Sequence, residues 1–231
     1  MSYRVSVTTI EKFRRYMTEA STFDTEESLL DSIKGFFLGN DKTKFGEAWG
    51  KIIEEGHKFK HVSGNLNGYL VDGIFFSEEL ARPAVEFAAA HPKMIYEVPV
   101  AKEYEVNGMT ILVSGRTDGI EGNITRDTKC KFRTPDFQEY VDSYQWRFYL
   151  DMLNAKTFYY DVFEVQGFDS LVYDKKGIAW LHDINIIPYE PLYCSSYSDM
   201  HDDCKLLLRQ FFEYIEEKNL YQFLKPYKSN A

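Results

Sequence analysis

The sequence predicts an α/β fold in which a mixed sheet is flanked by helices and preceded by a helical N-terminal portion. Up to about residue 92, apolar residues recur at helical spacing, whereas from Met94 onward the chain turns to short runs rich in β-branched and aromatic residues. The resulting order of helices, three strands, a helix, further strands and a last helix is typical of a mixed sheet with helices on its faces. We expect a single domain over residues 1–231, mainly helical over 1–92 and containing the sheet with its flanking helices over 93–231.

Helices are expected in the N-terminal portion wherever apolar residues lie three or four positions apart. The stripes are Ile10, Phe13 and Met17; then Leu29, Ile33 and Phe36; then Phe45, Trp49, Ile52 and Ile53. Each stripe would bury one side of a helix against the rest of the domain.

The β-rich runs predict strands within residues 94–100, 109–120, 123–132, 156–165 and 177–187. Residues 134–155 predict one helix, capped by Thr134, with Pro135 at its first position. Its apolar stripe is Phe137, Val141, Tyr144 and Phe148. A last helix over 198–218 carries Cys204, Leu207, Leu208, Phe211 and Ile215 on one side.

The formal net charge of −9 argues against a protein that holds duplex DNA by a broad basic face. Phosphate groups are therefore expected to be bound by a small local group of basic residues. The 17 Tyr and 18 Phe are interpreted as core residues rather than as a base-stacking surface, because no aromatic–basic repeat organises them.

The N-terminus lacks the apolar run of a secretory signal, and no stretch approaches the roughly 20 apolar residues that span a bilayer. We therefore expect no membrane association and a location in the cytoplasm, or in the host cytoplasm for a viral protein. Cys130, Cys194 and Cys204 are odd in number and lack CxxC spacing. This pattern predicts reduced thiols rather than disulfides or a closed cysteine zinc site.

A β-hairpin is expected around Gly122 and Asn123, a pair that suits a two-residue loop between β-rich runs. In that register Glu121 faces Ile124, and Asp118 falls directly opposite Asp127. Two facing carboxylates repel one another unless a cation lies between them, and hard oxygen ligands favour Mg²⁺ or Mn²⁺ over zinc. The register therefore predicts a metal site.

Lys129 lies two positions after Asp127 and would share its face of the strand. In phosphodiester hydrolysis such an ammonium can orient water or stabilise the charge that builds up on the phosphate. Arg116 would share a face with Asp118 and lie opposite Lys129. The competing interpretation is an exposed hairpin with a structural Asp–Lys salt bridge and no metal, and the residues alone leave both open.

The run GRTDGI, the triplet DTK, and Gln145 and Tyr149 on the following helix, taken together, resemble the PD-(D/E)XK nuclease superfamily. The likeness is strongest to its RecB-like and phage lambda-exonuclease-like branches, which show a G-x-x-D strand, a D/E-x-K strand and a Q-x-x-x-Y helix in this order. It covers the stretch from about Tyr96 to Tyr149 well and the rest of the chain more loosely.

The resemblance implies roles for individual residues. Asp118 and Asp127 would bind Mg²⁺ or Mn²⁺, together with the main-chain carbonyl of Thr128, and Lys129 would be the catalytic lysine. Glu97 matches an acidic position that can bind a second metal or a water, although a solvated strand residue is the alternative.

Further positions would support the site or contact nucleic acid. Gln145 and Tyr149 lie four positions apart on one side of a helix, where they would support the lysine strand or touch the substrate. Arg116, Lys131 and Arg133 could bind phosphates, although surface solvation explains each of them singly.

The sequence also departs from the family pattern. The opening SVTTIEKFRRYMTE resembles an S-x-S-x-x-x-x-F motif but lacks the Cys-Pro that often follows it, so no iron–sulfur cluster is expected. FGEAWGKIIEE resembles the helix that carries G-x-x-x-H in many relatives, but here Gly50 occupies the histidine position. Glu47 or Glu54 could supply acidity instead, and an ordinary helix surface explains both equally well. His57 and His61 are interpreted as solvated.

The function expected from these residues is a metal-dependent deoxyribonuclease, with an exonuclease of recombination or repair, of phage type, favoured over an endonuclease of the same fold. The alternative is a protein without catalytic activity, a nucleic-acid-binding module that has lost its nuclease activity. The glycine at position 50, where many relatives have a histidine, supports this alternative. DNA is the expected partner, and a single-strand annealing protein or another recombination protein is a candidate partner. The sequence does not indicate an oligomeric state or a polarity of digestion.

Overall fold

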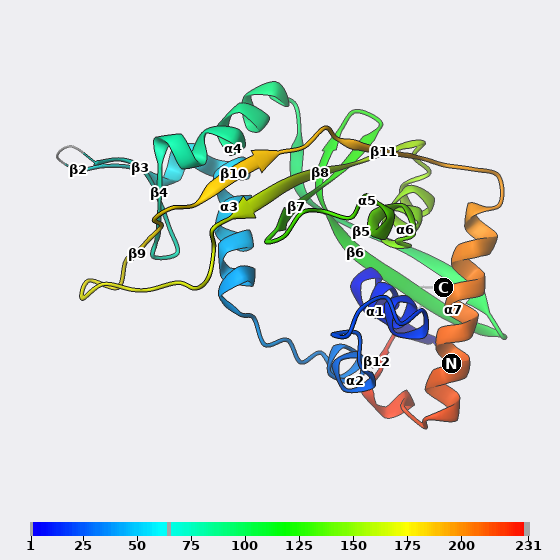
Figure 1. Cartoon of the computed structure of the whole chain (residues 1–231). Coiled ribbons are helices and arrows are strands. Elements are labelled where there is room, and N and C mark those ends of the chain that lie inside the picture. Colours follow the sequence, from blue (N-terminus) through cyan, green and yellow to red (C-terminus); the bar gives the residue numbers. More distant parts are fainter. Residues whose placement is uncertain (1, 64–65, 229–231) are drawn as a thin grey trace.

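The structure is a computed structural model that describes residues 2–63 and 66–228. Its main sheet runs in the order β10-β8-β7-β6-β1-β12, with β5 added on β6 and β11 on β8 (Figure 1). These strands are β1 (Ser2–Ser6), β5 (Ile95–Val106), β6 (Met109–Glu121), β7 (Ile124–Lys131), β8 (Thr157–Gln166), β10 (Asn185–Pro188), β11 (Leu192–Ser195) and β12 (Lys225–Pro226). The pairs β1–β6 and β7–β8 are parallel and the other pairs are antiparallel, so the predicted mixed sheet is confirmed.

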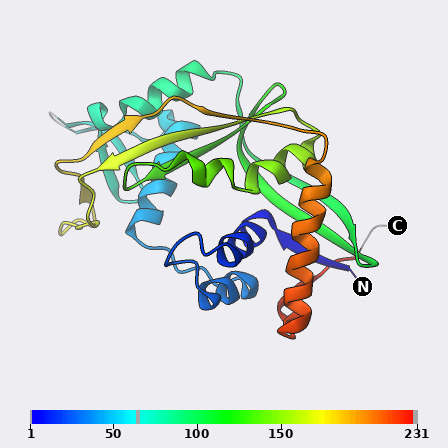
Figure 2. The same cartoon turned by 45° about the vertical axis from the view of Figure 1, so that its right-hand side comes forward.

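Helices pack around this sheet in two groups. One core cluster joins the sheet to α1 (Val7–Met17), α2 (Glu26–Lys34), α6 (Gln145–Leu153) and α7 (Met200–Glu217). A second core cluster joins the other end of β8 to α3 (Asp41–Phe59) and α4 (Glu78–Ala90). Figure 2 shows α7, in orange, beside α1 and α2, with α3 and α4 at the opposite end of the molecule.

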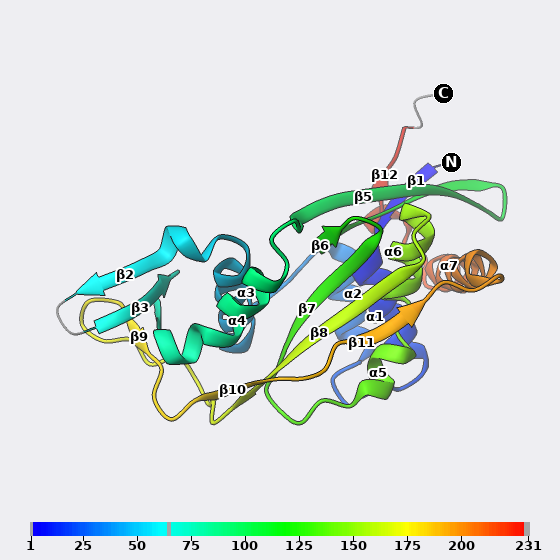
Figure 3. The ribbon, with the colours of Figure 1, turned by 90° about the horizontal axis from the view of Figure 1, so that it is seen from above.

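The N-terminal portion contains the expected helices, except that α2 ends before Phe36, which is exposed instead of buried. It also contains strands that the spacing of apolar residues did not indicate. Besides β1, a small second sheet lies beside α3 and α4 (Figure 3). Its strands are β2 (Lys60–Ser63), β3 (Leu66–Val71), β4 (Ile74–Ser77) and β9 (Ala179–Trp180). The run 177–187, expected to form one strand, is therefore divided between the two sheets. The chain turns between β9 and β10, where Asp183 has a left-handed φ of 56°.

The single helix expected over 134–155 is wrong: the segment forms α5 (Phe137–Val141) and α6 (Gln145–Leu153). The Arg147 guanidinium donates hydrogen bonds to the main-chain carbonyls of residues 141–143, and Glu11 accepts one from the amide of Tyr144. Side chains thus satisfy the backbone groups that a continuous helix would pair. Asp136, not Thr134, caps α5. The last helix, by contrast, is confirmed as α7 with its expected apolar side buried.

Two further features bear on the expectations from composition. Within the described residues, no helix combines the length and the apolar character that a bilayer crossing requires. Cys130, Cys194 and Cys204 are all free thiols.

Candidate active site

The hairpin between β6 and β7 has the predicted register over its first pairs. Glu121 pairs with Ile124, and Gly119 pairs with Arg126, around a loop in which Gly122 has a φ of 60°. The next step in this register would pair Asp118 with Asp127, but the paired ladder ends before it. Beyond that point β6 pairs with β1 and β5, while β7 pairs with β8, so the two strands part where the two aspartates lie.

The carboxylate of Asp118 occupies the place where the strands part. Its Oδ2 accepts hydrogen bonds from the main-chain N–H of Thr128 at 2.7 Å and from the Thr128 hydroxyl at 3.1 Å. The amide therefore keeps a partner although the cross-strand ladder has ended. As a result, Asp118 is oriented towards β7 by the backbone of the D-x-K triplet.

Asp127 is buried, with only 1% of its side chain exposed, and both of its carboxylate oxygens face a donor. Lys129 Nζ lies 2.5 Å from Oδ2, and Gln145 Nε2 donates a hydrogen bond of 2.8 Å to Oδ1. Burial and the nearby charge of Asp118 raise the pKa of Asp127 to about 7, against the opposing effect of Lys129.

Lys129 remains a charged group in this setting. Burial by itself lowers its pKa, but the carboxylates of Asp127 and Asp118 outweigh that effect, so the pKa of Lys129 is raised above its ordinary value. About a third of the Lys129 side chain is exposed, and the side chain lines a cavity of about 410 Å³. The lysine is therefore a permanent cation at the edge of an acidic cluster.

Tyr149 supports β6 instead of projecting towards a substrate. It is buried, and its hydroxyl donates a hydrogen bond of 2.8 Å to the main-chain carbonyl of Arg116. Its ring occupies the space of a side chain at Gly115, where an added Cβ would lie 2.7 Å from the ring. Support of the lysine strand, expected from both residues, comes from Gln145, which contacts Asp127 on β7, whereas Tyr149 contacts β6.

Glu97 lies opposite Asp118 in the β5–β6 register, between the pairs Tyr96–Gly119 and Val98–Thr117. Its φ of 54° is left-handed, a conformation that costs a residue with a side chain about 1–2 kcal/mol. Its carboxylate forms an ion pair of 2.8 Å with Arg116, and both side chains are largely exposed. The register thus brings Glu97, Asp118 and Asp127 onto three neighbouring strands.

Glu54 on α3 also belongs to this cluster; the sequence named it with Glu47 as a possible source of acidity, without deciding between them. It is half-buried, and burial together with the charges of Glu97 and Asp118 raises its pKa to about 7. A Cβ placed at Gly50 would lie 3.7 Å from Glu54 Oε1, so the glutamate carboxylate fills the space above the glycine. The available signal was its position four residues after Gly50, on the same side of the helix.

The remaining candidates lie further from the cluster. Lys131 and Arg133 both form ion pairs with Glu139, at 3.1 and 2.7 Å. His57 belongs to α3 and His61 to β2, so the two do not share a helix. Glu47 lines a cavity of about 410 Å³ that opens beside Lys129. Its other polar lining residues are Asn40, Lys42, Thr43 and Thr128.

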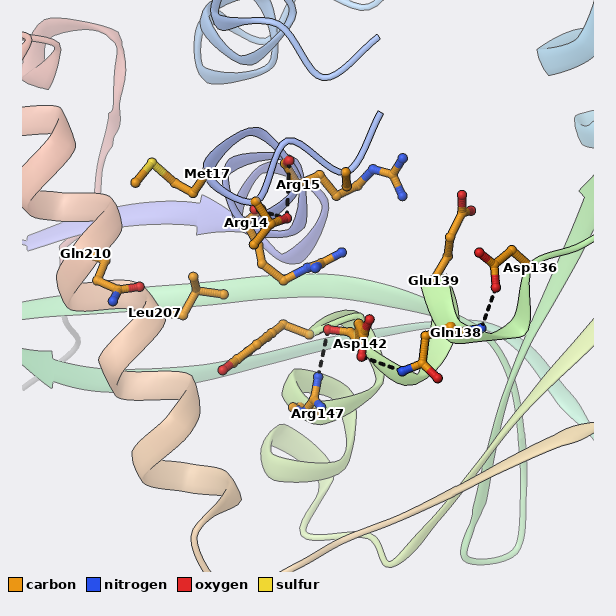
Figure 4. A pocket seen from close by; sticks show the side chains of 13 residues that line it. Arg14, Arg15, Met17, Asp136, Gln138, Glu139, Asp142, Arg147, Leu207 and Gln210 are labelled. Carbon is orange, nitrogen blue, oxygen red and sulfur yellow. Dashed lines mark hydrogen bonds between the residues drawn. The ribbon is translucent and has the colours of Figure 1, made fainter. Parts of the chain in front are cut away.

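A cavity of about 650 Å³ between α1, α5, α6 and α7 has a different character (Figure 4). Its three arginines are already engaged: Arg14 with Glu11, Arg15 with Asp24, and Arg147 with main-chain carbonyls. The acidic cluster does not line this cavity. The acidic cluster, and not this larger cavity, is therefore the candidate active site.

Neither a protein family profile nor a curated protein matches the sequence. Among solved structures, SSO0001 aligns over 92% of this chain and 76% of its own, at 13% identity and a TM-score of 0.50. LHK-Exo in complex with dAMP aligns over 94% of this chain and 90% of its own, at 13% identity and a TM-score of 0.45. A protein from Eubacterium rectale assigned as an exonuclease aligns over 93% and 80%, at 9% identity and a TM-score of 0.49.

The likeness to SSO0001 extends over nearly the whole chain, and at 13% identity it concerns the fold alone. The mixed sheet flanked by helices is the fold class expected from the sequence. The chemistry of the site follows from its own residues.

The carboxylate side chains of the cluster are chemically suitable ligands for a divalent metal. Among residues 2–63 and 66–228, no three acidic, histidine or cysteine side chains already close around a metal position. Carboxylate oxygens are the donors that Mg²⁺ and Mn²⁺ prefer. Burial and repulsion between carboxylates raise the pKa of Glu54 and Asp127, and a cation would relieve the repulsion. The four carboxylates are Glu54, Glu97, Asp118 and Asp127.

Proposed function

We propose that this chain is a divalent-metal-dependent deoxyribonuclease that hydrolyses phosphodiester bonds, and that it acts as an exonuclease. The observation that carries the proposal is the buried Asp127 carboxylate, held between Lys129 and Gln145 beside the carboxylate of Asp118. A buried carboxylate that is repelled by a second carboxylate is unfavourable for folding, and beside a lysine it is useful for phosphoryl chemistry.

The proposed metal ligands are Asp118, Asp127, Glu97 and the main-chain carbonyl of Thr128, and Glu54 joins them. A bound Mg²⁺ or Mn²⁺ would lower the pKa of water and neutralise charge on the phosphate. Each of these carboxylates would have to be deprotonated to bind it.

Other side chains of the site would act on the substrate directly. Lys129, kept protonated by its acidic neighbours, would stabilise the negative charge that develops on the phosphate or orient the attacking water. Arg116 is 65% exposed and would bind a phosphate of the strand, as Lys131 would further along β7. Gln145 and Tyr149 would hold β7 and β6 in place.

The test is digestion of 5′-labelled, 3′-labelled and circular DNA with Mg²⁺, Mn²⁺ or EDTA. We expect linear DNA to be degraded with metal, and Asp127→Asn to lose activity by about 10³-fold or more. Asp169→Asn replaces an exposed carboxylate outside the cluster and should retain full activity. Cutting of the circle would assign an endonuclease instead. If the parent and Asp127→Asn degrade DNA at the same background rate, the chain is a nucleic-acid-binding module and not a nuclease.

We place the enzyme in recombination or repair, of phage type, acting in the cytoplasm, with DNA as its partner. A single-strand annealing protein is the protein partner that would use the strand left by such an exonuclease. This part of the proposal is supported by the resemblance of the GRTDGI, DTK and Gln145–Tyr149 elements to recombination nucleases. Co-purification with a single-strand annealing protein encoded beside it would test it.

A further inference from the structure

We propose that two adjoining cavities beside the active site bind an unpaired end of a nucleic-acid strand, with a phosphate in the smaller cavity and a base in the larger one. The inference rests on the proposed nuclease function and adds the kind of substrate end that the enzyme engages. It uses residues of β1, α1, α2 and β12, Ser114 on β6, and the segment that follows α2; these residues have no part in the proposed metal chemistry.

The smaller cavity, of about 290 Å³, concentrates positive charge in a chain whose net charge is −9. No carboxylate lines it, and within the described residues none of its three cations belongs to an ion pair. The cations are Arg4, Lys34 and Lys225. Unneutralised cations around a small cavity favour a phosphate group as the ligand.

Hydroxyl groups complete the wall between these cations. Arg4 Nε donates a hydrogen bond of 3.0 Å to the buried Ser114, which fixes the guanidinium against β6. Ser32 donates to Thr9 at 3.2 Å, and Ser6 lies 2.8 Å from the same Thr9 hydroxyl. Guanidinium and hydroxyl donors held in this way are the groups that commonly bind phosphate oxygens.

The larger cavity, of about 640 Å³, shares Ser6, Thr9, Ser32 and Gly35 with the smaller one. Its outer wall is the segment that leaves α2 towards α3 (Figure 1), where Phe36 and Phe37 are 66% and 77% exposed. Neighbouring exposed aromatic rings are a platform for stacking bases. A phosphate in the smaller cavity would therefore leave its base beside these rings.

Strand β6 connects the smaller cavity, which it lines through Ser114, to the proposed metal ligand Asp118. Ser114, Arg116 and Asp118 are alternate residues of β6, so their side chains leave the strand in the same direction. The distance along β6 from Ser114 to Asp118 is about 13 Å. A short stretch of strand could thus reach from the cavity past Arg116 to the site. An unpaired base has free faces for stacking on Phe36 or Phe37, whereas a base inside a duplex is already stacked between its neighbours.

The binding test uses the full chain carrying Asp127→Asn, so that substrates survive, with 3′-labelled oligonucleotides followed by fluorescence anisotropy. The substrates are a single strand, a duplex with an unpaired overhang and a blunt duplex. We expect Arg4→Gln with Lys34→Gln to weaken binding of the unpaired substrates about ten-fold and to lower the salt slope by about 0.7. Phe37→Ala should weaken them about five-fold or more.

Matched variants outside the cavities provide the control. Phe23→Ala removes an aromatic ring that is 81% exposed, and Lys175→Gln removes an exposed cation; both should bind as the parent does. The proposal is overturned if the cavity variants also bind like the parent, or if they weaken blunt duplex as much as unpaired substrates. Comparing 5′-phosphate with 5′-hydroxyl ends then assigns the bound phosphate as terminal or internal.

A separate measurement distinguishes failure of this inference from failure of the nuclease proposal. Hydrolysis of bis(p-nitrophenyl) phosphate with Mn²⁺ needs the acidic cluster but not the cavities. With Asp127 intact, the cavity variants should hydrolyse it at the parental rate. An inactive parent whose unpaired-strand binding still depends on Arg4 and Phe37 would refute the nuclease and keep the strand site.

Discussion

Gln145 Nε2 lies 2.8 Å from Asp127 Oδ1, and this hydrogen bond joins α6 to the strand that carries Lys129. Since Lys129 faces the other oxygen, at 2.5 Å, the carboxylate cannot rotate without losing a partner. A helix on one side of the sheet therefore sets the orientation of a candidate metal ligand, and this relationship can be tested by changing Gln145 alone.

We expect Gln145→Ala to lower kcat about 10- to 100-fold with little change in KM, since it removes the support of Asp127 and leaves substrate-binding groups in place. The measurement is steady-state digestion of linear DNA with saturating Mn²⁺. Gln138→Ala, which removes an exposed glutamine that contacts Asp142, should keep parental kcat. Parental kcat in Gln145→Ala would show that the hydrogen bond does not position the carboxylate.

Glu54→Gln should weaken Mn²⁺ binding at least about ten-fold, because Glu54 faces the same charges as the other proposed ligands. Glu47→Gln provides the comparison, since Glu47 lies on the same helix, α3, and lines the neighbouring cavity beside Lys129. Calorimetric titration of the full chain with Mn²⁺ gives both affinities. If Glu47→Gln has the larger effect, the assignment of Glu54 is wrong.

Metal-induced stabilisation should increase with pH. The folded-state pKa values of Glu54 and Asp127 are raised to about 7, so both carboxylates hold protons below that pH and release them above it. Without metal, these two groups make the fold less stable as pH rises from their ordinary range through about 7, because the folded state then binds more protons than the unfolded state. Metal needs the deprotonated forms and reverses this trend.

The corresponding measurement is thermal unfolding with and without Mg²⁺ at about pH 6 and about pH 8. We expect the rise in Tm caused by Mg²⁺ to be small at the lower pH and larger at the higher one. Glu54→Gln should weaken this dependence. A shift in Tm of equal size at both pH values would contradict the proton linkage.

Glu97→Gly should separate stability from activity. Glycine adopts the left-handed φ of residue 97 without strain, so this variant is expected to be about 1 kcal/mol more stable towards urea than Glu97→Ala. Both variants lose the carboxylate and should lose nuclease activity to the same degree. Equal unfolding midpoints for the two variants would show that the backbone at residue 97 is unstrained in solution.

Local patterns predicted the parts of the site that lie close together in sequence. The loop at Gly122 and Asn123 fixed the hairpin register, and strand alternation placed Lys129 beside Asp127. Glu54 was harder to assign, because its significance depends on contacts of α3 with strands more than 40 residues away. The same holds for the break between α5 and α6, where Arg147 and Glu11 replace helical hydrogen bonds.

The parting of β6 and β7 limited the precision of the register prediction. Pairing rules place Asp118 opposite Asp127, but they assume that the ladder continues. Here each strand takes a different neighbour, and Asp118 bonds to the amide of Thr128 instead. Which neighbour a strand takes is a property of the whole sheet and cannot be obtained from the two runs alone.

The proximity of Asp127 and Glu54 to other carboxylates also affects which mutations selection would retain at these positions during evolution. Burial and neighbouring carboxylates favour a neutral side chain at residue 54 in the metal-free fold, so mutation of Glu54 to an amide would relieve repulsion and still permit folding. A lineage selected for folding alone could lose Glu54 at little cost, whereas loss of Asp127 would leave Lys129 without its ion-pair partner. The presence of Glu54 together with Asp127 and Lys129 is therefore more readily explained by selection for a cation-dependent activity than by selection for stability.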